Sequence, residues 1–261
     1  MLEIDMNLVK QTYTDTNLHQ KMEEKIRPWL DIMQKENHPD IAKKQIELCQ
    51  IGKLLATYFN EYSIKELRES PDFVISNGTD NIGLEHQIII ENNTKQKEGF
   101  FENLCARVEN EIATTTDLGN FAINLYFNKG IESQISKKNE IISVLKAIVV
   151  EKITNDRLLP NPYVYNACVM KQNRISIIAN FGAFMQKQLG ESEILEAIKK
   201  KEKLIESYRA NTFQNQWLVL VIGQVNESSF EVRTDFEMKN QSKFDKVFVY
   251  EDFNNQLFEL I

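Results

Sequence analysis

The segment Trp217–Gly223, WLVLVIG, constrains the fold more than any other part of the chain. It has the length of a β-strand and every residue in it is apolar, so both of its faces should be buried. A strand that is buried on both faces needs helices on each side of its sheet. We therefore expect an α/β protein whose central sheet is covered by helices on both faces.

Helical and strand patterns alternate along the rest of the chain. Apolar residues at three- and four-residue spacing predict helices, and short apolar runs predict strands. The predicted helices lie within 1–35 (with a kink or split at Pro28), 41–62, 99–114, 139–153 and 192–209, and the predicted strands are 122–127, 163–170, 174–180, 244–250 and 256–260. This order predicts one α/β domain with a central mixed β-sheet over residues 41–261 and a helical N-terminal extension over residues 1–40. Ser63 is expected to cap a short turn before a hairpin.

The composition excludes several classes of protein. The chain has 261 residues, of which 42% are hydrophobic, enough for a substantial core. No apolar run has the length of a membrane span, and the N-terminal residues lack the pattern of a secretory signal. The three cysteines are odd in number and widely spaced, which favours free thiols in a reducing compartment. We expect a cytoplasmic protein without a membrane partner.

Two carboxylates, Asp72 and Glu85, lie on the two strands of the predicted hairpin. The turn is at residues 77–78 or 78–79, and Asp72 then lies opposite Gly83 or opposite Glu85. Because side chains alternate along a strand, the two carboxylates share a face in either register. Opposed side chains lie roughly 5 Å apart, and two carboxylates at that distance repel each other unless a cation or a proton lies between them. The pair therefore suits a hard divalent ion such as Mg²⁺.

The sequence around this pair resembles a known motif. PDF at residues 71–73, a turn, and then GLExQ at residues 83–87, with an apolar helix before and another after, resemble the core of the PD-(D/E)XK nuclease superfamily, which has the restriction-endonuclease-like fold. Residues 243–250 and the charged helix before WLVLVIG also resemble a bacterial branch of this superfamily. The resemblance implies a Mg²⁺- or Mn²⁺-dependent nuclease that hydrolyses phosphodiester bonds, with DNA as the expected substrate.

The resemblance also implies roles for individual residues. Asp72 and Glu85 would bind the metal ion, and the backbone carbonyl of His86 would be a third ligand. A glutamate on the preceding helix often assists in this family, and here it would be Glu61 or Glu66. No other cofactor is implied.

One position departs from the family. Gln87 stands where the motif has a lysine; it would position the attacking water, but an amide supplies no positive charge. A lysine from elsewhere could take over that role, and the candidates are Lys95, Lys97, Lys200 and Lys203. The alternative function is a catalytically inactive nuclease-fold protein that acts as a binding or interaction module.

Other features are more typical of structure than of chemistry. The His86 ring faces away from Glu85 on its strand, so a packed or surface histidine is expected. The lysines of residues 199–203 alternate with glutamates, which is typical of a solvated helix face. A formal charge of −7 argues mildly against a protein that coats nucleic acid, but not against a nuclease. The expected partner is nucleic acid, and a homodimer is left open.

Overall fold

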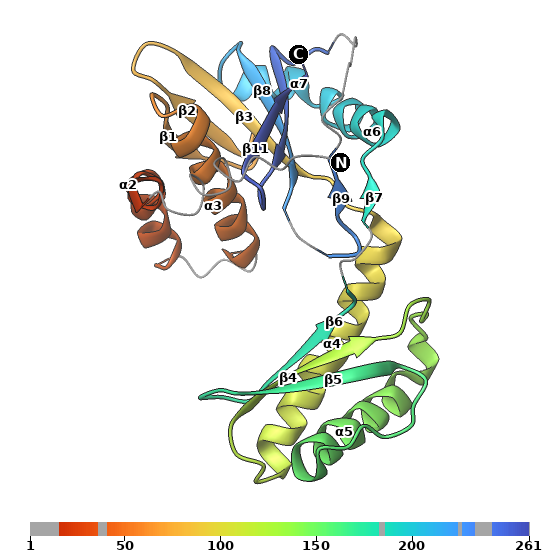
Figure 1. The fold of residues 1–261 in the computed structure, drawn as a ribbon. Helices are drawn as coiled ribbons and strands as arrows, with labels where there is room; N and C mark the ends of the chain where they lie inside the picture. Colours follow the sequence, from red (N-terminus) through yellow and green to blue (C-terminus); the bar gives the residue numbers. More distant parts are fainter. Residues whose placement is uncertain (1–15, 36–40, 183–185, 224–225, 233–241, 261) are drawn as a thin grey trace, which may run out of the picture. The chain divides into compact units, whose positions relative to one another are not determined.

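The structure is a computed structural model that describes residues 16–35, 41–182, 186–223, 226–232 and 242–260. The chain divides into two units (Figure 1). The first unit holds the described residues of Met1–Ile89, Gln188–Gln224 and Glu231–Ile261, and the second holds those of Ile90–Lys187 and Val225–Phe230. The second unit is therefore made of two segments that are inserted separately in the sequence of the first.

The first unit is built on a mixed sheet of six strands among the described residues, in the order β1-β2-β3-β8-β10-β11. The strands β1, β2 and β3 form an antiparallel meander, β3, β8 and β10 are parallel to one another, and β11 returns antiparallel to β10. The bounds are β1 (Ser63–Leu67), β2 (Phe73–Ser76), β3 (Asn81–Ile88), β8 (Gln216–Ile222), β10 (Lys246–Glu251) and β11 (Gln256–Glu259). The predicted α/β fold with a central mixed sheet flanked by helices is confirmed.

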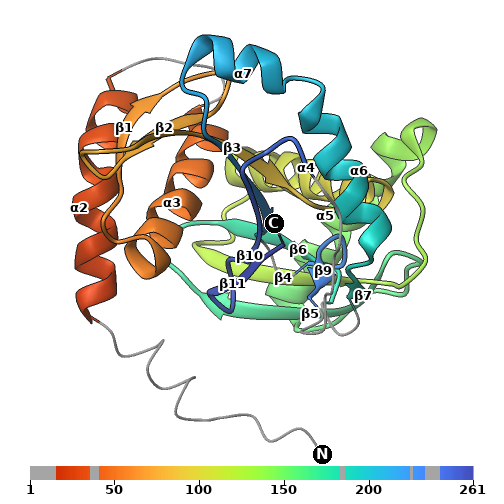
Figure 2. The ribbon, with the colours of Figure 1, turned by 90° about the horizontal axis from the view of Figure 1, so that it is seen from above.

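Helices lie on both faces of this sheet (Figure 2). One face is covered by α2 (Thr16–Met33) and α3 (Ile41–Tyr58), and the other by α6 (Glu191–Glu202) and α7 (Ile205–Asn211). Strand β8 is buried at all seven positions, as its apolar sequence predicts. Trp217, Val219 and Val221 pack into the core on the α2–α3 side, so Leu218 and Leu220 face α6 and α7.

Two local predictions in this unit need correction. Of the kink or split expected at Pro28, the split is wrong, because helix α2 continues through Pro28; its residues Ile26 and Met33 are buried, so packing outweighs the lost hydrogen bond. Ser63 does not cap a turn but begins strand β1, in which Ile64 is buried between exposed residues. The charges of β1 suit its position as the edge strand of the sheet.

The second unit contains α4 (Asn92–Thr115), β4 (Phe121–Phe127), the 3₁₀ turn η1 (Ile135–Lys137), α5 (Lys138–Asn155), β5 (Val164–Lys171) and β6 (Ser176–Asn180). The three strands form a sheet in the order β5-β4-β6, with β4 antiparallel to β5 and parallel to β6. Residues of α4 and α5 form a core with one face of this sheet. The short strands β7 (Lys187–Gln188) and β9 (Phe230–Glu231) pair with each other.

The units differ from the domain boundaries that the sequence suggests. Those boundaries separate residues 1–40 from a domain over 41–261, whereas α2 belongs to the first unit and residues 41–261 contribute to both. Residues 1–15 and 36–40 lie outside the described residues. Among the helices that the structure describes, none has the length and apolar character needed to cross a membrane.

Candidate active site

The hairpin register places the two predicted carboxylates side by side. Phe73 pairs with Leu84 and Ser76 with Asn81, so the turn is centred on residues 78–79. Continuing this register by one residue puts Asp72 opposite Glu85. The second of the two predicted registers is thus the one observed.

Backbone hydrogen bonds place Asp72 and Glu85 in the closer kind of antiparallel pair. The N–H groups of Gly83 and Ile89 donate to the carbonyls of Asn215 and Val221, on the side of β8. Glu85 is an even number of residues from both, so its backbone N–H and C=O also point toward β8 and not toward β2. A pair that exchanges no hydrogen bonds across the strands has its side chains closest together. The His86 N–H donates to Asp72 Oδ2 at 2.8 Å, and the Asp72 N–H donates to Glu85 Oε2 at 3.3 Å.

Lys201 reaches this pair from α6. Its Nζ forms an ion pair with Glu85 Oε1, and the two side chains are 18% and 4% exposed. A buried carboxylate needs such a partner. The sequence names Lys200 and Lys203 as candidates on this helix, but the lysine that makes the contact is Lys201.

A spacing signal for Lys201 is present in the sequence. Ile194, Ile198, Ile205 and Tyr208 are all buried. Lys201 falls between them at the alternating three- and four-residue spacing of the inward stripe, so its side chain is directed toward the sheet.

The other face of β3 carries a second polar group. His86 Nε2 lies 2.8 Å from Gln50 Oε1 on α3, and His86 Nδ1 lies 3.9 Å from Glu47 Oε1. Burial lowers the pKa of His86 to about 3, and the positive charges of Lys201 and Lys43 add to this effect. The ring is therefore neutral at physiological pH and acts as a packed, hydrogen-bonded group.

Asp72 is the most strongly perturbed acid of the site. Burial raises the pKa of its carboxyl from 3.8 to about 7, and the charge of Glu85 adds to the rise. The hydrogen bond from His86 N–H lowers it, Glu47 raises it, and Lys201 lowers it. The raised pKa favours a proton between the two carboxylates, and a cation could take the place of that proton.

The other predicted residues lie as follows. Glu66 is on β1, not on a helix, and pairs with Arg68 at 2.7 Å. Glu61 is exposed between α3 and β1. The acid of α3 that influences Asp72 is Glu47, which the sequence reasoning missed although it is one turn before the buried Gln50.

Gln87 and the remaining lysine candidates have partners of their own. The Gln87 amide Nε2 donates to the Ile88 carbonyl at 2.7 Å, which leaves its oxygen as the atom that could hold a water. Lys95 pairs with Glu98 and Lys97 with Glu227, all in the second unit.

Two observations bear on whether the site could hold a metal ion. The backbone N–H and C=O of His86 point toward β2, and continuing the register puts Pro71 opposite His86. Pro71 has no N–H, so it cannot occupy the His86 carbonyl, which stays available as a ligand. The Tyr208 hydroxyl is buried and has no hydrogen-bond partner among the described residues. Burial and then the charge of Glu85 raise the pKa of Tyr208.

These donors fit a hard divalent ion. Among the described residues there is no group of three or more His, Cys, Asp or Glu side chains arranged for a metal. Mg²⁺ nevertheless needs only one or two carboxylates, because carbonyl, water and phosphate oxygens complete its shell. Asp72, Glu85 and the His86 carbonyl provide that set.

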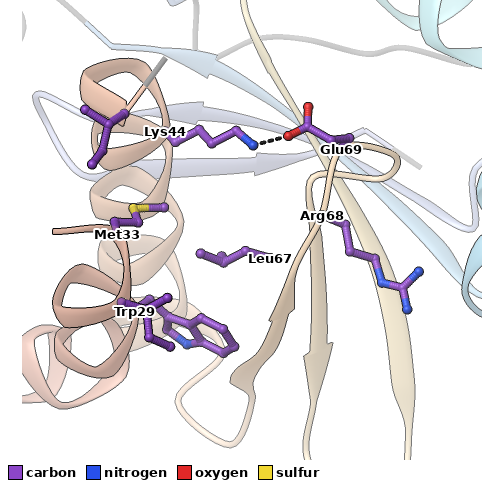
Figure 3. A pocket seen from close by; sticks show the side chains of 8 residues that line it. Trp29, Met33, Lys44, Leu67, Arg68 and Glu69 are labelled. Carbon is purple, nitrogen blue, oxygen red and sulfur yellow. Dashed lines mark hydrogen bonds and ion pairs between the residues drawn. The ribbon is translucent and has the colours of Figure 1, made fainter. Parts of the chain in front are cut away.

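A cavity of about 320 Å³ lies in the same unit between α2, α3 and β1 (Figure 3). It is lined by Trp29, Ile32, Met33, Ile41, Lys44, Leu67, Arg68 and Glu69. Lys44 and Glu69 form an ion pair across it. The cavity lies on the α2–α3 side of the sheet, whereas Lys201 reaches Glu85 from the α6 side. The two features are therefore separate.

The fold and the site define an α/β protein with a buried, lysine-paired carboxylate beside a carboxylate of raised pKa. No family model, curated protein or solved structure matches the chain.

Proposed function

We propose that this protein is a Mg²⁺- or Mn²⁺-dependent nuclease that hydrolyses phosphodiester bonds, with DNA as the expected substrate. The observation that carries the proposal is the pairing of Asp72 with Glu85 at the end of the hairpin, with Lys201 in contact with Glu85. Two carboxylates and a lysine on one face of a sheet are suited to binding a cation and a phosphate together. The likeness to the PD-(D/E)XK motif points to the same chemistry.

Each residue has a role in this proposal. Asp72, Glu85 and the His86 carbonyl would hold the ion, which when bound lowers the pKa of a water molecule and stabilises negative charge on the phosphate. Lys201 would leave Glu85 and donate to a phosphate oxygen, supplying the positive charge that Gln87 lacks. The Gln87 oxygen would orient the water. Glu47 raises the pKa of Asp72 from the α3 side.

Cleavage assays test this function. Plasmid DNA and single-stranded circular DNA are incubated with the full chain in Mn²⁺, in Mg²⁺ and in EDTA. We expect metal-dependent cleavage that is lost in Asp72→Asn and retained in Asp31→Asn, an exposed acid on α2. If the wild type never cuts in Mn²⁺, or if Asp72→Asn cuts equally well, the nuclease proposal fails.

The Lys201–Glu85 ion pair favours a second candidate, a catalytically silent binding module with a nuclease-like fold. Lys201 already neutralises Glu85 without a metal ion. Calorimetric titration with Mn²⁺ separates the two candidates, because a silent module should bind no ion and Asp72→Asn should then behave like the wild type.

The cysteines bear on where in the cell the protein works, whichever of the two candidate functions it has. Cys49, Cys105 and Cys168 are free thiols. Free thiols persist in reducing compartments, so we infer that the protein works in the cytoplasm.

A further inference from the structure

The sheet of the second unit has one covered face and one open face. Phe121, Ile123, Leu125 and Phe127 of β4 point toward the core shared with α4 and α5. The alternate residues therefore point the other way. The strand registers set them in three rows across the sheet: Met170, Ala122 and Ser176; Cys168, Asn124 and Ile178; Asn166, Tyr126 and Asn180. We call these residues, together with Tyr165, the open face.

The open face exposes large side chains at its edges. Tyr165 is 53% exposed, Met170 48% and Ile178 42%. The rings of Tyr165 and Tyr126 lie with their centroids 6.0 Å apart. Exposed aromatic rings on a sheet are surfaces on which nucleic-acid bases stack. The asparagines of the face add amides that can bond to base edges.

The charge around the open face is unlike that of the whole chain. The formal net charge of the chain is −7, yet residues 118–131 and 158–190, which include all three strands, contain no Asp or Glu. Arg174, at the turn between β5 and β6, is exposed. Glu109 of α4 reaches the β6 edge, where its Oε2 accepts from the Ile177 N–H at 2.8 Å, but the strands themselves carry no carboxylate. Strands without acids, with an exposed arginine at the adjoining turn, favour a polyanion more than the acidic chain as a whole does.

We propose that the open face binds single-stranded nucleic acid. Stacking on Tyr165 and Tyr126 requires base faces that are free, and in a duplex those faces are already stacked on each other. This binding goes beyond the proposed nuclease and needs no metal ion, because the open face belongs to the second unit and contains none of the candidate catalytic residues.

Fluorescence anisotropy tests the proposal with the wild-type full chain in EDTA, so that no metal-dependent cleavage can interfere. The probes are labelled single-stranded DNA of roughly 20 nucleotides, RNA of the same sequence, and the DNA duplex. We expect both single strands, or one of them, to bind more tightly than the duplex. Whichever of the two single strands binds more tightly shows whether the ligand is DNA or RNA.

Ring variants test the stacking contact. Tyr165→Ala should weaken single-strand binding about 5-fold or more, and Tyr165→Phe, which keeps the ring, should bind like the wild type. Phe253→Ala is the matched control, since Phe253 is an aromatic residue of the first unit that is 62% exposed; it should leave binding unchanged.

Charge variants test the electrostatic contact. Arg174→Ala should reduce the slope of log affinity against log salt by about 0.7. Lys146→Ala removes the same charge from α5, on the covered side, and should leave the slope unchanged.

Three results would overturn the proposal. The first is equal affinity for single strands and duplex, and the second is a Tyr165→Ala protein that binds like the wild type. The third is a change of oligomeric state in Tyr165→Ala by analytical ultracentrifugation, which would make the open face a contact between copies of the chain. All three can be observed whether or not the protein is a nuclease.

Discussion

Replacing Asp72 by Asn should make the protein more stable at alkaline pH, although it removes a candidate metal ligand. The pKa of Asp72 rises from 3.8 to about 7 on folding, chiefly because of burial and then because of Glu85. An acid whose pKa is higher in the folded state holds its proton more tightly there, so the free energy of unfolding falls as the pH rises between these two values. Asn cannot ionise, and its oxygen can still accept from the His86 N–H. The increase in the free energy of unfolding of Asp72→Asn over the wild type should therefore be absent near pH 4 and complete above pH 7.

The size of the gain follows from the pKa. The rise from 3.8 to about 7 corresponds to about 4 kcal/mol at 1.36 kcal/mol per pKa unit. Asp72 is partly exposed, so water screens its charge. We therefore expect Asp72→Asn to raise the free energy of unfolding by about 2 kcal/mol at about pH 8.

Urea unfolding followed by tryptophan fluorescence measures this effect in the first unit alone, because both tryptophans, Trp29 and Trp217, lie there. The titrations are made in EDTA at about pH 5 and about pH 8. Asp31→Asn, the same change at an exposed acid of α2, is the control and should show no pH-dependent gain. A variant Asp72→Asn that is less stable than the wild type at alkaline pH, or whose gain does not change with pH, would refute the reasoning.

Three further predictions concern the same site. Lys201→Met leaves the buried Glu85 without a positively charged partner and should lower the free energy of unfolding by about 3 kcal/mol in the same urea titrations; a loss below about 0.5 kcal/mol would mean that the ion pair is unimportant. Gly83→Ala should cost about 1–3 kcal/mol in that assay, because its Cβ would lie 2.3 Å from Oε1 of the buried Gln216; an unchanged midpoint would show that Gln216 moves freely. Mn²⁺ affinity, measured by calorimetry, should rise up to about tenfold per pH unit below pH 7, because the ion must displace the Asp72 proton; a flat profile would contradict this.

Local periodicity predicted most of the helices and strands because burial imposes it. The apolar run of β8 must be covered on both faces, and that requirement alone leads to an α/β sheet. The shared face of Asp72 and Glu85 was predictable for a related reason. A side-chain period of two makes that conclusion independent of which hairpin register forms.

The rest depends on contacts between distant parts of the sequence. A pattern of helices and strands does not reveal which sheet each strand joins, so the division into two units was not predictable from periodicity. Lys201 is 116 residues from Glu85, and its charge made a solvated face the simpler interpretation. Only its place in the stripe of Ile198 and Ile205 indicates that it points inward.

The position of the second unit in the sequence connects the two proposals. Strand β3, which carries Glu85, ends just before the second unit begins, and α6, which carries Lys201, begins just after residues 90–187 end. A single-stranded nucleic acid bound on the open face is thereby tethered to the unit that contains the carboxylate pair. Tethering raises the effective concentration of the rest of that nucleic acid at the pair. This increase exists only for nucleic acids long enough to contact the open face and the carboxylate pair at the same time. Loss of the Tyr165 ring should therefore slow cleavage of long single strands while leaving cleavage of short oligonucleotides unchanged.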